Sequence, residues 1–282
     1  MLATVRRHDG FGCHIYWTIV AINWSKKNNI EFKFTKLPIS YKNHQKGIVD
    51  TGVLYDWEYN NIYGNEDMNK INDLFCEIMT NIDVESIERD FKCLNLGIKE
   101  NIRKIVNSKK GEYFNEDINL SLSKSFKELT SKPEIYNNDN LNIAIHIRRG
   151  KDLTGETPRG KNHKNSKRWV PGKYYDIVLS KLIKIENAKI HIFSQSDPLL
   201  NKKWKDNDKI IFHTANFGSG EFYDHWEKMV YSDILILSPS TYSHSAAFFN
   251  TGKVVLLKDS YEMFPLSPSK WEENNIELLG GL

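Results

Sequence analysis

The feature that most constrains this chain is a regular alternation, in its second half, of short apolar runs with segments capable of forming helices. The apolar runs are rich in β-branched residues, as buried strands are, and they lie at 141–147, 189–193, 209–213, 233–237 and 253–257. Helix-capable segments lie at 172–186, 198–204, 224–231, 241–250 and 268–279. Near-continuous apolar strands that alternate with helices predict a parallel sheet covered on both faces.

The first half of the chain is less regular. A Gly-rich turn opens an expected helix over 10–29, and a strand is expected over 30–35. The middle predicts helices with polar faces, for example over 68–81 and 86–107. Pro, Asn and Asp then gather over 131–140, as they do in a linker between domains.

This organisation predicts two α/β domains, an N-terminal domain over 1–135 and a C-terminal domain over 136–282. The length of 282 residues agrees, because domains average roughly 150 residues. Two such domains imply a cleft between them. Open α/β sheets bind their ligands at the carboxyl ends of the strands, which would face that cleft.

Composition excludes several classes of protein. With 39 basic and 36 acidic residues the net charge is +3, too close to balance for a general nucleic-acid binder. No apolar run reaches the roughly 18 residues of a membrane span, and no apolar segment of a signal peptide follows the first residues, so we expect a cytoplasmic protein. Cys13, Cys76 and Cys93 are odd in number and without metal-like spacing, which favours reduced thiols.

Two adjacent arginines stand at the end of the first strand of the second half, in HIRRGKD (146–152). If the strand continues through them, Arg148 and Arg149 point to opposite sides, so one of them faces a ligand. A guanidinium fork fits a pair of phosphate oxygens and suits a diphosphate leaving group. The alternative is a pair of surface arginines that form salt bridges.

HIRRGKD resembles the HxRRGD segment of the α-1,2-, α-1,6- and protein O-fucosyltransferases, a superfamily with the GT-B fold of two Rossmann-like lobes and an interlobe cleft. Further segments of the chain resemble this superfamily in the same order: DGFG (9–12), the pair Tyr174-Tyr175, FSQSDP (193–198) and SPSTYSHSAAF (238–248). The chain departs from the pattern at Lys151, where the family has Asp, and at His244-Ser245, where it has a Trp pair. The resemblance leaves the region 36–140 unmatched.

The resemblance implies roles for the residues around the arginines. Arg148 would contact the diphosphate of the donor and offset the charge that develops on the leaving group. Arg149 would support the loop, and His146 would donate to a phosphate or pack in the sheet. Asp197, with Ser196 before it, would hold the base or ribose of the donor, although Ser-Asp-Pro is also a helix-start signal.

Hydroxyl groups and glycines supply the other expected donor-binding residues. Ser240, Thr241, Tyr242 and Ser243 precede or open an expected helix, where hydroxyls either bind phosphate or cap the helix. Gly10 and Gly12 would let the backbone approach the donor pyrophosphate or the acceptor, although a lone Gly-x-Gly is a weak motif.

The resemblance also suggests a general base. In protein O-fucosyltransferases a carboxylate just before a Gly-Phe pair lies near the acceptor, and Asp9 occupies that position here. An inverting displacement needs such a base on the face opposite the leaving group. His14, Asp152 and Glu156 are alternatives, and Asp9 could instead be an ordinary turn residue.

We expect no metal site. The one Asp-x-Asp string, Asp206-Asn207-Asp208, predicts a turn, and an arginine can replace the charge of a divalent ion. The polar, basic stretch 151–172 predicts a loop, which either covers the donor or is a solvated surface segment.

Together these features predict an inverting, metal-independent glycosyltransferase that needs no cofactor. Its donor would be a nucleotide sugar, GDP-fucose first and a UDP-sugar such as UDP-xylose second, and its acceptor a glycan hydroxyl. A chain without an expected anchor fits a bacterial or large-DNA-virus enzyme. A non-catalytic protein that binds a sugar nucleotide or glycan is the alternative from another class.

Overall fold

In the computed structural model of this chain, the residues described are 2–3, 11–37, 65–87, 114–136, 139–149, 170–194, 198, 200–214, 221–256 and 272–273. The helices within these ranges are α1 (Phe11–Lys27), α2 (Asn65–Thr80), α4 (Glu116–Leu129), α6 (Gly172–Leu182), α7 (Phe222–Tyr231), α8 (Thr241–Ala247) and the 3-10 turn η1 (Lys202–Trp204). The strands are β1 (Leu2–Ala3), β2 (Glu31–Phe32), β3 (Phe34–Thr35), β4 (Ser86–Ile87), β5 (Leu141–Ile147), β6 (Ala188–Ser194), β7 (Ile210–Thr214), β8 (Ile234–Ile236), β9 (Lys253–Leu256) and β10 (Glu272–Glu273).

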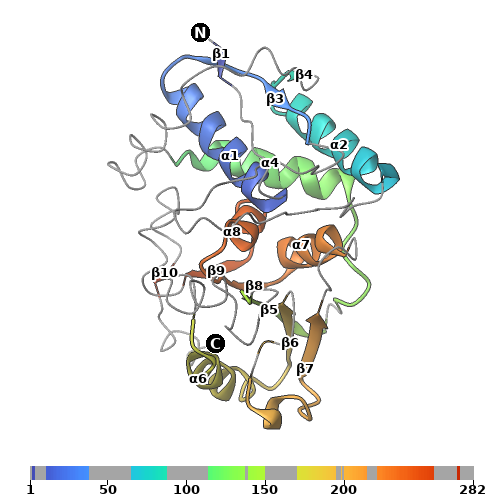
Figure 1. Ribbon diagram of the computed structural model, residues 1–282, viewed down its shortest axis with the longest axis vertical. Coiled ribbons are helices and arrows are strands. Elements are labelled where there is room, and N and C mark those ends of the chain that lie inside the picture. Colours follow the sequence, from blue (N-terminus) through green and yellow to red (C-terminus); the bar gives the residue numbers. More distant parts are fainter. Residues whose placement is uncertain are drawn as a thin grey trace, which may run out of the picture.

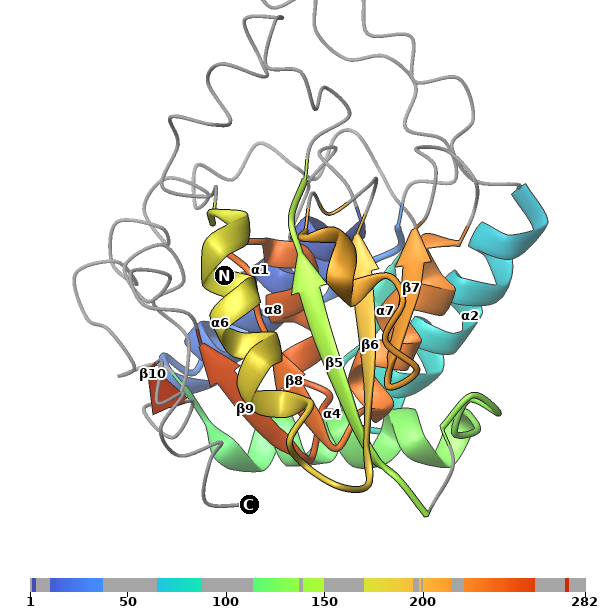
Figure 2. The same cartoon turned by 90° about the horizontal axis from the view of Figure 1, so that it is seen from below.

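A six-stranded, parallel sheet forms the centre of the second half. Its strand order is β10-β9-β8-β5-β6-β7, so the chain starts in the middle, adds β6 and β7 on one side, and returns to add β8, β9 and β10 on the other. Figure 2 shows β5 in the middle of this sheet, with α6 in front of it and α7 and α8 behind. This is the order of a doubly wound fold, which reverses direction between its first and fourth strands.

The pairing of β5 with β8 is locked at its start by a side chain. The carboxylate of Asp233, just before β8, accepts hydrogen bonds from the backbone nitrogen of Asn142 at 2.8 Å and from its side-chain amide at 3.2 Å. The backbone nitrogen of Asp233 donates in return to the carbonyl of Asn142 at 2.9 Å. These bonds fix the register in which the two strands run to the opposite edge of the sheet.

The two faces of the sheet belong to different cores, as the period of two in a strand requires. Ile143, Ile145 and Ile147 of β5 face the side of α6 and pack with its buried residues Tyr175, Val178, Leu179 and Leu182. The spacing of these four is that of one helical face. Ala144 of the same strand belongs to the other core, which contains α7 and α8.

Helices of the first half form a further layer over α7 and α8. Figure 1 shows α1, α2 and α4 at one end of the molecule, then α7 and α8, then the sheet, and α6 at the other end. Trp226 of α7 is fully buried at the centre of this packing, with Phe11, Phe75, Phe126 and Phe249 around it at centroid distances of 5.3–5.9 Å. One continuous hydrophobic core therefore joins the helices of both halves.

Most strands lie where the sequence predicts them. The expected run 141–147 matches β5 residue for residue, and the runs expected at 189–193, 209–213, 233–237 and 253–257 match β6, β7, β8 and β9 within two residues at each end. The helix expected over 10–29 is α1, the one over 68–81 is α2, and the strand expected over 30–35 is divided into β2 and β3. The non-helical connection expected over 131–140 is also present where the structure describes it.

Three expectations about helices are wrong in part. The segment 268–279 contains β10 at Glu272–Glu273, because pairing with Val255 and Leu256 on the open edge of β9 overrides local preference. The helix expected over 198–204 is reduced to η1, where Asn201 caps a single turn and Trp204 is buried against α6. The segment 86–107 opens with β4 instead of a helix, and its residues from 88 on lie outside the described ranges.

Two of the three cysteines lie within the described ranges. Cys13 and Cys76 take part in no disulfide bond within the described ranges, and Cys93 lies outside these ranges. No helix within these ranges is long and apolar enough to cross a membrane.

Gly12 lies at a close approach between helices α1 and α8. A Cβ atom added at this position would lie 2.4 Å from the Cα of Tyr242, a distance that only a shift of one backbone relative to the other could relieve. The absence of a side chain at Gly12 therefore allows the N-terminal turn of α1 to pack on the first turn of α8.

We predict that Gly12→Ala lowers the free energy of unfolding by about 1–3 kcal/mol, the usual cost of overpacking a rigid contact. Urea denaturation of the full chain measures it, with Lys26→Ala, an exposed change in the same helix, expected to stay within about 0.5 kcal/mol of the parent. An unchanged or raised stability of Gly12→Ala would contradict the close approach.

Candidate functional site

The reversal of strand order puts the ends of β5 and β8 side by side at the carboxyl edge of the sheet. Ile145 pairs with Ile236, so the residues that follow each strand leave the sheet at the same level. Doubly wound sheets bind ligands in the crevice at this switch point, because the neighbouring loops diverge to opposite faces. HIRRGKD begins with the last two residues of β5 and continues beyond it here, and the segment that begins at Ser238 follows β8.

His146 is buried near the end of β5, and its ring joins the two strand ends. Its Nδ1 lies 2.6 Å from the hydroxyl oxygen of Ser238, and its ring lies 5.4 Å from that of Tyr242. Burial, followed by the positive charge of Arg148, lowers the pKa of His146 to about 3. The imidazole is therefore neutral at physiological pH, and the Arg148 charge acts directly on it.

The two arginines have separate surroundings, as the alternation of a strand predicts. Arg149 is buried on the side of α6, where Nε donates to the carbonyl of Pro198 at 3.0 Å and Nη1 to that of Val170 at 3.2 Å. Its guanidinium carbon lies 5.7 Å from the centre of the Tyr175 ring. Arg149 thus holds three segments together, as the supporting role expected for it requires, and its expected contact with the donor remains a prediction.

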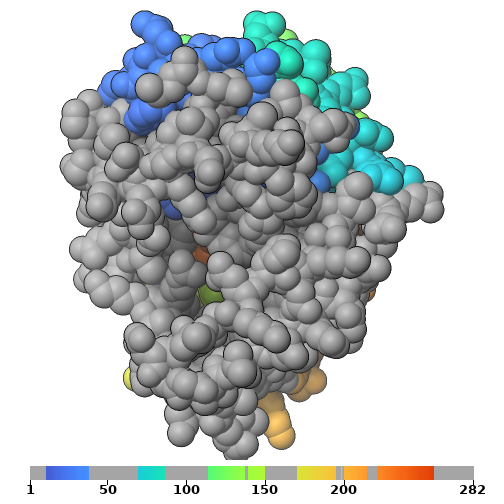
Figure 3. All heavy atoms as spheres, turned by 45° about the horizontal axis from the view of Figure 1, so that its top comes forward, coloured from blue at the N-terminus to red at the C-terminus, as the bar shows by residue number. Residues whose placement is uncertain are grey.

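Arg148 is half-buried on the side of His146. Figure 3 shows small areas in the colours of the end of β5 and of the region around α8, close together at the bottom of a hollow in this face. The edge of the sheet that carries Arg148 is therefore reached from outside.

Two of the hydroxyls expected to bind the donor are used within the turn before α8. Ser240 is the N-cap, and its side chain accepts from the backbone nitrogen of Tyr242 at 3.3 Å. Ser243 is fully buried and donates to the carbonyls of Ser238 and Ser240, each at 3.3 Å. Their side chains do what the capping interpretation predicts, while Thr241 is half-buried at the first position of the helix.

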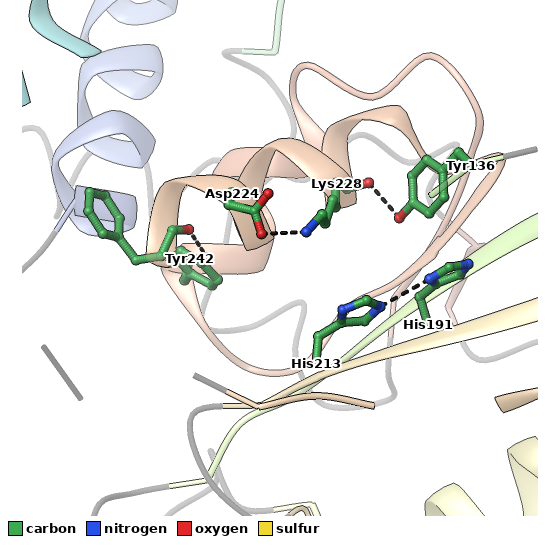
Figure 4. A network of polar contacts seen from close by, with 7 residues as sticks. Tyr136, His191, His213, Asp224, Lys228 and Tyr242 are labelled. Carbon is green, nitrogen blue, oxygen red and sulfur yellow. Dashed lines mark hydrogen bonds and ion pairs between the residues drawn. The ribbon is translucent and has the colours of Figure 1, made fainter. Parts of the chain in front are cut away.

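Tyr242 is a packing residue that connects three elements. Its hydroxyl donates to the carbonyl of Phe222 at the start of α7, its ring lies beside His146, and its Cα faces Gly12. Figure 4 shows the side chain of Tyr242 pointing toward the start of α7. Gly12 thus has a packing function, and a contact of its backbone with the donor stays a prediction.

Several expected site residues lie outside the described ranges, namely Asp9, Gly10, Ser196, Asp197, Asp152 and Glu156. His14, an alternative base, is described: it is fully buried on α1, with Nε2 lying 3.2 Å from the carbonyl oxygen of Thr35. Burial inside the first half separates its ring from the solvent, so we do not retain it as a base.

Sequence reasoning missed two features of this edge. Ser238, the partner of His146, opens the segment 238–248 that resembles the superfamily, but the expected donor-binding set begins at Ser240, and the signal for Ser238 was its place after a strand that ends beside β5. The second feature is a group of histidines: Nδ1 of His191 lies 3.1 Å from Nε2 of His213, and the ring of His213 stacks on Phe193 at 4.6 Å. His225 of α7 packs against the same rings at 5.9 Å from His213 and 5.3 Å from Phe193.

Figure 4 shows His191 and His213 on neighbouring strands beneath α7, whose Asp224 and Lys228 form an ion pair. Tyr136 donates to the carbonyl of Lys228 at 2.7 Å and packs edge-on against His191. Burial, followed by the positive charges of Lys228 and Lys189, lowers the pKa of His191 to about 4.

The described residues were also searched for side chains that could bind a metal ion. Within the described ranges, no group of three or more His, Cys, Asp or Glu side chains is placed to hold a metal ion. The string Asp206-Asn207-Asp208 forms the turn that the sequence predicts, with the side-chain oxygen of Asn207 accepting from the backbone nitrogen of Lys209 at 3.0 Å.

Fold and site together define a doubly wound α/β protein whose candidate ligand site lies at the strand-order switch point. No protein-family model matches the chain, and no curated protein matches it. Among solved structures it is similar to NodZ alpha-1,6-fucosyltransferase soaked with GDP-fucose, with a TM-score of 0.43 and 10% sequence identity over 94% of this chain and 96% of that one.

We predict that acid destabilises the protein through its buried histidines. Burial is the main cause of lowered pKa values at five histidines. The pKa is about 3 for His146, His213 and His244 and about 4 for His191, and the pKa of His225 is also lowered. The unfolded chain binds these protons at about pH 6.5 and the folded chain does not, so stability is full above that pH and falls below it. From pH 8 to pH 5, the buried His146 and His244 together account for a loss of about 4 kcal/mol.

Urea denaturation at pH 8, 6 and 5 measures this slope. The matched variant His213→Phe keeps the ring stack on Phe193 and removes one titrating group, so its stability should depend less steeply on pH. Equal stability of the parent chain at pH 8 and pH 5 would show that these rings are protonated in the folded protein.

We also predict that Arg149→Ala lowers the free energy of unfolding by about 3 kcal/mol, because it leaves the carbonyls of Pro198 and Val170 without their charged donor. Arg149→Lys should not restore the loss, since an ammonium lacks the planar fork. Thermal and urea melts measure both variants, and a wild-type stability of Arg149→Ala would rule out the supporting role.

Proposed function

We propose that this chain is an inverting, metal-independent glycosyltransferase that transfers a sugar from a nucleotide-sugar donor, with GDP-fucose favoured, to a hydroxyl of a glycan. The observation that carries the proposal is the place of Arg148. It follows the central strand β5 at the switch point of a doubly wound sheet, where such folds bind nucleotides. The resemblance of HIRRGKD to the fucosyltransferase segment supports the same position.

In the proposed reaction a base takes the proton from the acceptor hydroxyl, the oxygen attacks the anomeric carbon, and the nucleoside diphosphate leaves. Arg148 offsets the negative charge that grows on the diphosphate, an effect that commonly contributes several kcal/mol to transition-state stabilisation. His146, neutral and next to Arg148, would donate a hydrogen bond to the same diphosphate. Arg149 would keep the loop that carries Arg148 in place through its bonds to neighbouring carbonyls.

Asp9 is the proposed base. It lies two residues before Phe11, the first residue of α1, whose initial turn packs on Tyr242 next to His146. In the proposal the part before residue 136 binds the acceptor, and Ser196, Asp197 and Thr241 of the second part bind the donor.

A thermal-shift screen tests the donor. We predict that GDP or GDP-fucose raises the melting temperature of the full chain, since a ligand at 100 times its dissociation constant stabilises by about 2.7 kcal/mol. UDP and UDP-xylose are tested in parallel. A shift with these alone would make a UDP-sugar the donor instead of GDP-fucose and leave the proposed mechanism unchanged. No shift with any nucleotide would contradict the proposal.

Arg148→Ala should abolish the shift and the transfer of sugar while the protein melts as the parent does. Lys189→Ala, which removes a cation at the amino end of the neighbouring strand β6, is the matched control and should keep both. Transfer should persist with a chelator present. Full nucleotide binding by Arg148→Ala would remove the basis of the proposal.

The same assay separates an enzyme from a non-catalytic binder. An enzyme releases nucleoside diphosphate with an acceptor and loses this release in Asp9→Asn, whose nucleotide binding should stay unchanged. Binding of donor without release over a broad panel of glycans would favour the binder.

A further inference from the structure

The hydrogen bond between Ser238 and His146 joins the two strands that define the candidate site. Ser238 lies two residues beyond β8 and is fully buried, and its hydroxyl oxygen lies 2.6 Å from Nδ1 of His146. The backbone carbonyl of Ser238 accepts from the backbone nitrogen of Ser240 at 2.6 Å and from the hydroxyl of Ser243 at 3.3 Å. Ser238 is therefore held in a fixed turn, and its side chain has a fixed direction.

The direction of this hydrogen bond follows from the number of protons that Ser238 can donate. Among the described residues, Nδ1 of His146 is the one hydrogen-bond partner recorded for the Ser238 hydroxyl. If Nδ1–H donated to it, the hydroxyl proton would be buried without an acceptor. If the hydroxyl donates to Nδ1, its proton is bonded and what stays unpaired is a lone pair of its oxygen. An unpaired lone pair costs less free energy than an unpaired buried proton. Ser238 is therefore the donor and Nδ1 the acceptor.

We propose that Ser238 is a positioning residue that donates to Nδ1 of His146 and thereby keeps the imidazole proton on Nε2, the ring nitrogen that donates to an anionic oxygen of the bound nucleoside diphosphate. This inference rests on the proposed function for the identity of the anion. It gives Ser238, which the expected donor-binding set does not include, control over what His146 presents to the ligand.

The surroundings of His146 make the tautomer decisive. The ring packs beside that of Tyr242 and feels the positive charge of Arg148, the nearby rings of His244 and His225 and, most weakly, the charge of Arg149 on the other side of the strand. Burial and these cations keep the imidazole neutral, so His146 cannot attract a phosphate by charge. With the proton on Nε2 it donates to a phosphate oxygen, and with the proton on Nδ1 it would turn a lone pair toward that oxygen.

The tautomer can be observed without any ligand. Long-range proton–nitrogen correlation spectra of the ¹⁵N-labelled full chain at pH 7.5 separate the two forms, and His146→Gln assigns the signal. We expect Nε2 of His146 to be protonated and Nδ1 to show the shift of a hydrogen-bond acceptor. A proton on Nδ1 would overturn the proposal.

Calorimetric titration with GDP then tests the consequence for binding. Ser238→Ala should weaken GDP binding about tenfold, the effect of losing one oriented hydrogen bond. Ser194→Ala is the matched control, because Ser194 is buried at the end of β6 and its hydroxyl has no hydrogen-bond partner among the described residues, so affinity should not change. Should Ser238→Ala fail to fold, Ser238→Cys keeps the volume and replaces the hydroxyl with a weak donor.

The outcomes distinguish this inference from the function on which it rests. A chain that binds GDP with Nε2 protonated, and that loses affinity in Ser238→Ala, supports both. GDP binding that is unchanged in Ser238→Ala would overturn the role of Ser238 and leave the proposed function standing. A parent chain that binds neither GDP nor UDP would overturn the proposed function, and the ligand assigned to His146 with it.

Discussion

Parallel pairing of β5 with both β6 and β8 is the constraint on which the rest of this structure depends. The bonds between Asn142 and Asp233 fix the register at one end of the β5–β8 pair, and the strands carry that register to the other end. Ser238 and His146 meet there because the register is fixed. A slip of one residue would turn His146 to the side of α6 and break this contact, since neighbouring residues in a strand face opposite sides.

The two arginines show how one strand end serves two purposes. The guanidinium of Arg149 donates hydrogen bonds to backbone carbonyls and packs on the ring of Tyr175. These contacts hold the loop in place. Arg148, one residue earlier, faces His146 and acts on it through charge. In the proposed function, stability and ligand binding are assigned to adjacent residues, and the alternation of side chains along a strand keeps the two apart.

The layer of helices from the first half closes this arrangement from behind. Gly12 brings α1 against Tyr242, whose hydroxyl reaches Phe222 of α7 and whose ring lies beside His146. The aromatic core around Trp226 then joins α1, α2 and α4 to the same helices. The position of the site edge is therefore coupled to the packing of the first half, although more than 200 residues separate Gly12 from Tyr242 in the chain.

Local pattern in the chain was sufficient to locate β5 to β9, α1 and α2, because burial on a sheet or on one helical face leaves a period that can be read from neighbouring residues. It also pointed to opposite directions for Arg148 and Arg149. Folding in three dimensions was needed to assign the hydroxyls of Ser240 and Ser243 to the start of α8 and the turn before it, to give Gly12 a packing contact, to pair Ser238 with His146 and to add β10 to the sheet. Most of these contacts join residues far apart in the chain, and such partners leave no trace in local periodicity.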